Sequence, residues 1–233
     1  MDDDLNTNTR DYIVAVGRSA VSLVPFVGGV LGEIISVSVP RQRQDRIVEY
    51  VRMLDEKINL LEDSMQKLIS EDPERIDLIE SGAYSAASST SNQRIKYIVS
   101  LVISGISSED SNIIRRKRLL KILDEIDDDE LSILIAFGQS YTGHARDAWD
   151  KIDRPMPIHM QSENDEIERN HLFDFGQERL LTLGLISMNF GSLKRGQLPE
   201  FDPKKGRFKG GLRISAMGRI FLKEVGVEQP MGS

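Results

Sequence analysis

The side chains that carry most enzyme chemistry are scarce in this 233-residue chain. It has no cysteine, which excludes disulfides, thiolate nucleophiles and zinc sites built on sulfur. Its three histidines, His144, His159 and His171, include no pair at the short spacing of a helical metal site. Asp147 follows His144 by three residues, but no third group is placed to orient a proton-transfer pair. A helix-capping histidine is therefore the favoured interpretation.

Motifs for acyl and phosphate chemistry are also missing. The chain contains no Gly-x-Ser-x-Gly sequence, the turn that exposes a nucleophilic serine. Gly28-Gly29-x-x-Gly32 lacks the Lys-Ser/Thr of a phosphate-binding loop, and no strand clearly precedes it. We therefore expect a protein that is not an enzyme and has no cofactor and no metal.

Positive charge collects in one part of an acidic chain. The formal net charge is -7, yet residues 192–223 hold nine basic residues against Glu200 and Asp202, a local charge of +7 that leaves -14 on the rest. Phe201 and Phe208 lie among these basic residues, as in a recognition surface. The segment is predicted to bind a protein partner, nucleic acid or anionic lipid, and the alternative is a solvated loop. The basic residues singled out are Lys194, Arg195, Lys204, Lys205, Arg207, Lys209 and Arg213.

An apolar segment rich in glycine lies near the start of the chain. Its uncharged part, Ser19 to Gly32, has 14 residues, which is short for a bilayer span and fits a core helix. A proline and three glycines make a poor helix interior, so the other interpretation is a segment that inserts into a bilayer after oligomerisation. The residues that define this membrane segment are Val24, Pro25, Phe26, Gly28, Gly29 and Gly32.

The first ten residues, MDDDLNTNTR, are acidic where a secretory signal is basic. No uncharged apolar run reaches the ~20 residues of a spanning helix. We therefore expect a cytoplasmic protein that associates with the inner membrane when it is activated.

The clearest periodic signal predicts one long amphipathic helix between Arg41 and Ser70. Apolar residues recur there at alternating intervals of four and three, which places them in one narrow seam. The seam would pack on another helix, either in an intramolecular bundle or in a second chain of a homo-oligomer. Its members are Ile47, Val51, Leu54, Ile58, Leu61, Met65 and Leu68.

Capping signals mark the other helices of the first half. Asp72 before Pro73 supplies an N-cap and a proline at the first helical position, and Ser91 or Asn92 is placed to cap another helix. The acidic run at 127–130 falls in the first turn of a later helix, where the helix dipole favours negative charge. We expect a helical bundle over residues 1–110 and a second domain over residues 111–233.

From residue 164 the order of predicted elements is helix, short strand, basic hairpin, short strand and amphipathic helix. Ser215 is placed to cap the last helix, and Gly218 to let it pack closely on the strands. The sequences LLTLGLIS and LRISAMGRIFLKEVG resemble the ending of bacterial winged-helix domains. The expected fold is mainly α, with a helical bundle followed by a winged-helix domain that carries a small β-hairpin and a long basic loop.

A second resemblance concerns the first half. VPFVGGVLGEII, then Pro40, Asp45-Arg46 and an amphipathic helix, resembles the opening of bacterial abortive-infection alpha-type antiphage proteins. The resemblance implies an antiviral defence effector. Together with the basic segment and the apolar glycine-rich segment, it leads us to expect an effector that docks an infection-derived partner, of phage origin, and disrupts the inner membrane after oligomerisation. The alternatives are a DNA-binding winged-helix transcriptional regulator that dimerises through its bundle, and an adaptor in which neither site acts. The overall acidity weighs against the regulator.

Overall fold

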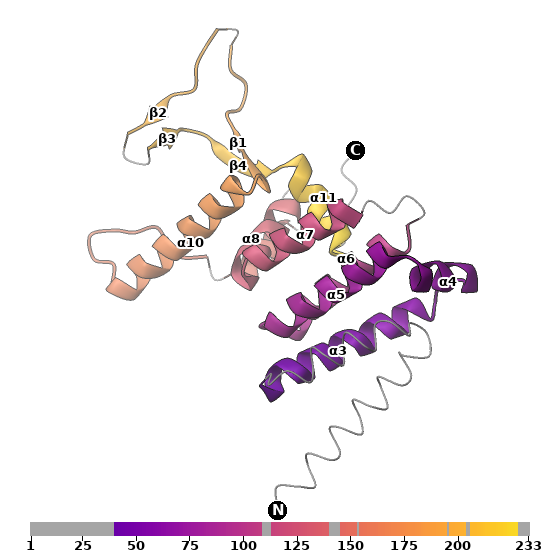
Figure 1. Cartoon of the computed structure of the whole chain (residues 1–233). Helices are drawn as coiled ribbons and strands as arrows, with labels where there is room; N and C mark the ends of the chain where they lie inside the picture. Colours follow the sequence, from indigo (N-terminus) through magenta and orange to yellow (C-terminus); the bar gives the residue numbers. More distant parts are fainter. Residues whose placement is uncertain are drawn as a thin grey trace, which may run out of the picture. The chain divides into compact units, whose positions relative to one another are not determined.

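The computed structural model describes residues 40–108, 113–139, 145–152, 154–194, 196–203 and 206–227, and the regular elements within them are helices and two small antiparallel sheets (Figure 1). The predicted mainly α class is confirmed. The chain divides into two compact units, one of residues 1–125 and 224–226, the other of residues 126–223 and 227–233. The predicted membrane segment, with Val24, Pro25, Phe26, Gly28, Gly29 and Gly32, lies outside the described residues.

The first unit is a layered helical bundle. Helix α3 packs on α5 and α6, which pack on each other and on α7 (Figure 1). The division between the units falls after Glu125, beyond the residue 110 expected from the sequence, because α7 packs on α5 and α6. The helices are α3 (Arg41–Ile58), α4 (Asp63–Glu71), α5 (Pro73–Ser88), α6 (Asn92–Ile106) and α7 (Ile113–Glu125).

The predicted caps of this bundle are confirmed. The Asp72 carboxylate accepts a hydrogen bond from the Glu74 backbone N–H at 2.9 Å, with Pro73 opening α5. The Ser91 hydroxyl accepts from the backbone N–H of Arg94 at 3.2 Å and begins α6. Each cap satisfies a donor that the first turn of a helix would otherwise leave unpaired.

The prediction of one continuous helix from Arg41 to Ser70 is wrong. Helix α3 ends at Ile58, a turn follows over residues 59–62, and α4 begins at Asp63. Asparagine competes with helical hydrogen bonding, and the Asn59 amide donates to Asp55 at the end of α3. The Gln66 amide donates to the Leu61 carbonyl at 2.9 Å across the turn.

The heptad seam therefore belongs to two helices with different surroundings. Its first four members, Ile47, Val51, Leu54 and Ile58, are buried where α3 packs on α5 and α6 of the same chain. The members beyond the break are less covered, since Leu61 and Met65 are half-buried and Leu68 is 40% exposed. Leu68 is only partly covered within the chain, and its packing on another helix stays a prediction.

Two buried arginines bind the carbonyl groups that helix ends leave free. Arg75 pairs with Asp72 and donates to the carbonyls of Ile106 and Ser108, at the end of α6. Arg94 donates to the Leu123 carbonyl in the last turn of α7. Carbonyls in the last turn of a helix lack intrahelical partners, so these bonds fasten the helices of the bundle to one another.

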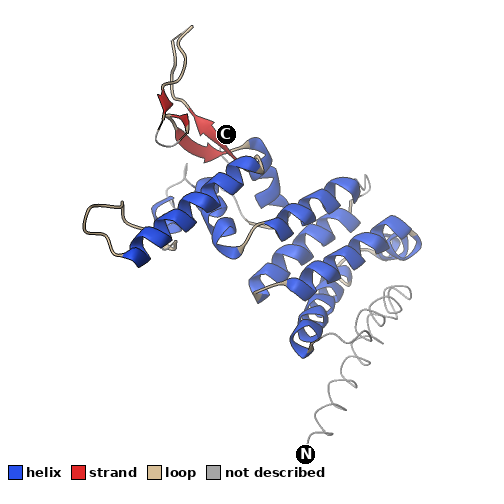
Figure 2. Ribbon diagram, turned by 60° about the vertical axis from the view of Figure 1, so that its left-hand side comes forward, coloured by secondary structure: helices blue, strands red, loops and turns tan. Residues whose placement is uncertain are grey.

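The second unit contains helices and two small antiparallel sheets (Figure 2). Strand β1 pairs with β4, with Ile186 opposite Ile214, and the short strands β2 and β3 pair within the long connection between them. The elements are α8 (Asp128–Gln139), α9 (Ala145–Asp150), α10 (Asn164–Thr182), β1 (Ile186–Asn189), β2 (Phe201–Asp202), β3 (Arg207–Phe208), β4 (Gly211–Ile214) and α11 (Ala216–Glu224), whose last residue is assigned to the first unit.

The predicted starts of α8 and α11 are confirmed. Asp127 and Glu130 form a reciprocal cap, each side chain accepting from the backbone N–H of the other. The Ser215 hydroxyl accepts from the Gly218 N–H at 2.9 Å, as expected of the N-cap of α11. Gly218 is buried against Leu185, the close approach for which a small residue was expected. Among the described residues, no helix combines the length and apolarity that crossing a membrane requires.

Candidate functional site

A long extension joins β1 to β4 in the second unit. We call residues 190–210 the extension. Beyond the β1–β4 ladder the chain pairs again at β2 and β3, where Phe201 lies opposite Phe208. The Lys209 N–H also donates to the Glu200 carbonyl at 2.6 Å. Figures 1 and 2 show the extension reaching away from α8 and α10. Within the extension, the described strand pairing is therefore confined to residues 200–202 and 207–209.

Three phenylalanine rings form an exposed cluster on the extension. The ring of Phe208 meets that of Phe190 at 6.3 Å and that of Phe201 at 5.6 Å, both edge to face. Phe201 is 51% exposed and Phe208 is 47% exposed. Edge-to-face contacts stabilise the rings against one another, while their outer surfaces stay open to solvent. We call Phe190, Phe201 and Phe208 the aromatic cluster, and it is an apolar contact surface that the unit itself leaves uncovered.

The predicted basic residues have different outcomes around this cluster. Lys194 and Lys209 have exposed side chains on the extension, and Arg213 is exposed on β4 opposite Ser187. The Lys209 ammonium pairs with the carboxylate of Glu200, which raises the pKa of Lys209. Arg207 lies in β3 by its backbone, but its side chain is outside the description, as are residues Arg195, Lys204 and Lys205.

Helix α10 carries a second exposed surface. Its 19 residues include five acidic side chains and two basic ones, a net charge of -3. Leu172 is 63% exposed and Phe175 is 58% exposed on the same helix. This surface was missed in the sequence analysis. Phe173 and Phe175 are two residues apart, and a helix turns such neighbours to different faces, which signals apolar residues on more than one side.

A groove lies between the start of α8, the residues after α9 and the middle of α10. We call it the α8–α10 groove, and its volume is about 600 Å³. Its apolar lining is Ile133, Ile152, Leu172, Phe173 and Phe175. Charged groups also line it: Asp127, Asp129 and Glu130 on the acidic side, Lys151 and Arg169 on the basic side. Glu130 is buried and pairs with Arg179 at 3.3 Å, which leaves Asp127 and Asp129 as the exposed acidic groups of the lining. The groove can accept an apolar side chain, with charged groups of both signs at its sides.

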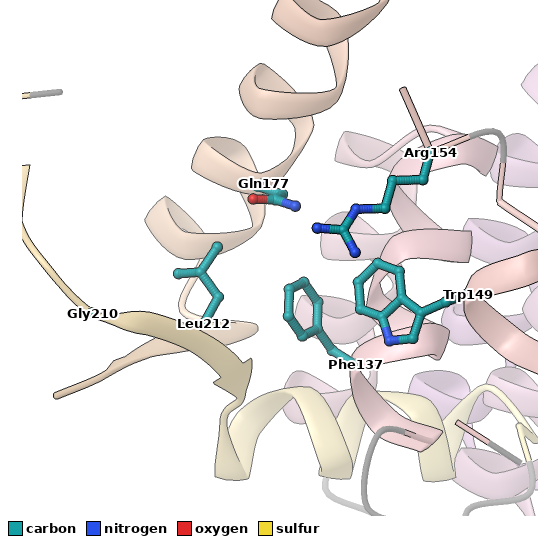
Figure 3. Close-up of a pocket in the computed structure, with 6 residues that line it drawn as sticks. All are labelled: Phe137, Trp149, Arg154, Gln177, Gly210 and Leu212. Atoms are coloured by element: carbon teal, nitrogen blue, oxygen red, sulfur yellow. The ribbon is translucent and has the colours of Figure 1, made fainter. Parts of the chain in front are cut away.

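A smaller cavity of about 260 Å³ lies near the base of the extension, lined by residues from α8 to β4 (Figure 3). The rings of Phe137 and Trp149 meet edge to face at 5.0 Å. Figure 3 shows the Arg154 guanidinium over the Trp149 ring, and their centres are 5.7 Å apart. A stacked arginine is held by the ring's negative face. Among the described residues of the lining, none has a carboxylate, imidazole or hydroxyl side chain. Its lining is Phe137, Trp149, Arg154, Gln177, Gly210 and Leu212.

The histidines do not gather into a site in the part of the chain that the structure describes. His159 accepts a hydrogen bond at Nδ1 from the Gln161 backbone N–H, and His171 is exposed on α10. His144 lies outside the described residues. The described residues contain no cluster of three or more His, Cys, Asp or Glu that could hold a metal ion. Comparisons of the chain with family models, with curated proteins and with solved structures find no match.

Proposed function

We propose that the chain is a non-enzymatic antiphage effector of the abortive-infection type. In this proposal the second unit is a winged-helix domain that docks a protein partner derived from the infecting phage. The apolar segment around Gly28 and Gly32 then disrupts the inner membrane after the chain has oligomerised. The defence role rests on the resemblance of VPFVGGVLGEII and the residues after it, and the docking role on the surfaces of the second unit.

The order of elements supports the winged-helix assignment. Helices α8, α9 and α10 precede the strand β1, the extension stands where a wing would be, and β4 leads into α11. In a DNA reader of this class, the helix in the position of α10 would enter the major groove. The chemistry of α10 therefore distinguishes a DNA reader from a protein-docking domain.

The observation that carries the docking role is the acidic and apolar surface of α10. Phosphates line both edges of a DNA groove and are met by lysine and arginine in DNA readers. The net charge of -3 on α10 would instead be repelled there. Exposed Leu172 and Phe175 are side chains of the kind that protein interfaces bury. A protein is therefore the ligand class that α10 fits best.

The runner-up function is a DNA-binding regulator, and the basic extension favours it. Residues 190–209 hold six basic and two acidic residues, a net charge of +4 in the position of a wing. Fluorescence anisotropy with duplex DNA at low salt separates the two functions. Lys194→Ser with Lys209→Ser would lower the slope of log affinity against log salt by about 0.9 for each lost phosphate contact. We expect no such binding by the native chain, and binding that follows this salt rule would contradict the docking role.

Dye release from anionic liposomes tests the membrane role. At concentrations where the purified chain has assembled, we expect it to release entrapped dye. Gly28→Leu and Gly32→Leu should abolish release, because a bulky residue prevents the close helix approach that small residues allow. Val30→Leu adds similar bulk at a position that already has a side chain, and it should keep native activity. The membrane role fails if the native chain releases no dye, or if the two glycine variants have lost their circular dichroism spectrum in solution.

A further inference from the structure

The extension and the α8–α10 groove of this chain are complementary in chemistry. The extension presents exposed phenylalanine rings within a stretch of net charge +4. The groove presents an apolar lining with Asp127 and Asp129 at the start of α8 and with Lys151 and Arg169 on its other side, and it runs along α10, whose net charge is -3. Opposite charges on facing surfaces speed encounter and select partners. Exposed apolar groups on both surfaces supply area that association would bury.

The extension does not fill the groove of its own unit. Figure 1 shows the strands β2 and β3 beside β1 and β4, apart from α8 and α10. Phe201 on the extension and Leu172 in the groove both stay more than half exposed. The two complementary surfaces are therefore free to meet those of another molecule.

We propose that the aromatic cluster of one copy docks in the α8–α10 groove of a second copy. This inference rests on the proposed protein-docking role and names a second copy of the chain as one partner of that surface. Two different surfaces meet in such a contact, so each copy keeps one extension and one groove unused. A head-to-tail contact of this kind adds copies until a ring closes, or continues as an open chain. The resulting assembly is the oligomer that the proposed function requires.

Light scattering across a concentration series tests the contact with the full chain. We expect the native mass to rise above that of a monomer with concentration and to fall with added salt, because the contact joins opposite charges. Phe201→Glu puts negative charge on the extension, and Leu172→Lys puts positive charge in the groove. Each variant should raise the dissociation constant of the contact at least about tenfold, which is the effect of losing one central anchor. Leu60→Lys changes a 79% exposed leucine of the first unit and is the matched control, which should assemble like the native chain.

Mixing the two variants gives the sharper result. The Phe201→Glu chain keeps an intact groove, and the Leu172→Lys chain keeps an intact extension. Their mixture should therefore form a one-to-one dimer and grow no further, while each variant alone stays monomeric. Circular dichroism and melting temperature check that both variants keep their fold. A native chain that is monomeric throughout the series would overturn the proposal, and so would variants that assemble as the native chain does.

A photo-crosslinking residue at position 201 keeps the test decisive if either charged variant unfolds. The native chain with this residue is mixed with isotopically labelled chain, exposed to light and digested. We expect crosslinked pairs of one labelled and one unlabelled peptide that join position 201 to residues 165–179. Crosslinks to other segments, or only within one copy, would refute the contact. Self-association without membrane activity would leave this inference standing while the effector function fails, so the two failures can be told apart.

Discussion

Gly218 lies directly against the main chain of Leu185, so close that a Cβ atom on Gly218 would come within 2.1 Å of the Leu185 carbonyl oxygen. The Ser215 N–H donates to that same oxygen at 3.0 Å. The start of α11 is thereby held against the residue before β1. The backbone of one element leaves no room for a side chain on the other, which makes glycine a requirement at this position.

Gly218→Ala should destabilise the second unit. The added methyl group meets a backbone oxygen that cannot rotate away, so α11 must shift, at about 1–3 kcal/mol for overpacking of this kind. Gly211→Ala is the matched control, because a Cβ there would meet its nearest atom at 4.0 Å. Urea denaturation measures both variants. Equal stability of the two would show that the close approach of α11 is not maintained in solution.

The break in the heptad predicts opposite results for two of its leucines. Leu54 is 4% exposed within the bundle, so Leu54→Asp buries an unpaired charge and should cost several kcal/mol. Leu68 is 40% exposed, so the new charge in Leu68→Asp can stay in contact with water and should cost much less than the buried charge in Leu54→Asp. Thermal melting compares the two variants. An equally large loss of thermal stability in both variants would instead support the continuous helix that the sequence pattern predicted.

Substitutions at Tyr50 and Gly82 in the bundle should have non-additive effects on stability. The Tyr50 hydroxyl donates to the Ile79 carbonyl at 2.9 Å, and a Cβ on Gly82 would lie 2.4 Å from that hydroxyl oxygen. Tyr50→Phe should cost about 1 kcal/mol for the lost bond, and Gly82→Ala should cost more. The double variant should be more stable than the sum of the two predicts, because removing the hydroxyl relieves the crowding. Additive effects in a double-mutant cycle would contradict this geometry.

Glu224 predicts a dependence of stability on pH. This residue belongs to the first unit, where its carboxylate accepts from the Ser104 hydroxyl at 3.0 Å and pairs with Arg116. Burial opposes its charged form, but the hydrogen bonds from Arg116 and Ser104 and the nearby positive charge outweigh it and lower the pKa of Glu224. The unfolded chain keeps the ordinary value near 4.5 and takes up the proton first as the pH falls.

The stabilisation by Glu224 is therefore complete above pH 4.5 and is lost as the pH falls through the lower pKa of the folded state. Below pH 4.5, the free energy of unfolding should fall more steeply in the native chain than in Glu224→Gln. Urea titrations at stepped pH values measure both profiles. Parallel profiles would show that the carboxylate is not held in this way in solution.

Local chemistry explains which elements the sequence could predict. The caps at Asp72, Ser91 and Ser215 depend on residues within three positions of one another, so the sequence contains all that forms them. The break after Ile58 was missed because a helix pair joined by a turn can keep the same apolar spacing as one helix. Whether the seam stays buried depends on α5 and α6, which are distant in sequence.

The candidate site was predictable only in part for the same reason. The charge of the extension could be counted from the sequence, and the place of Phe201 and Phe208 among basic residues was noted there. Their pairing across β2 and β3 depends on a ladder of two residues on each side, too short to give an alternating pattern. The groove requires α8 and α10 to be neighbours, and nothing local to either helix specifies that contact.

Loss of membrane potential on expression in bacteria tests the proposed effector function most directly. The full chain is induced in growing cells together with a potential-sensitive dye, beside the Gly32→Leu variant and the Val30→Leu control at matched protein levels. The proposed function predicts that the native chain and Val30→Leu depolarise the inner membrane when the trigger is present, while Gly32→Leu does not. An unchanged potential with the native chain, under phage infection as well as without it, would contradict the proposed function.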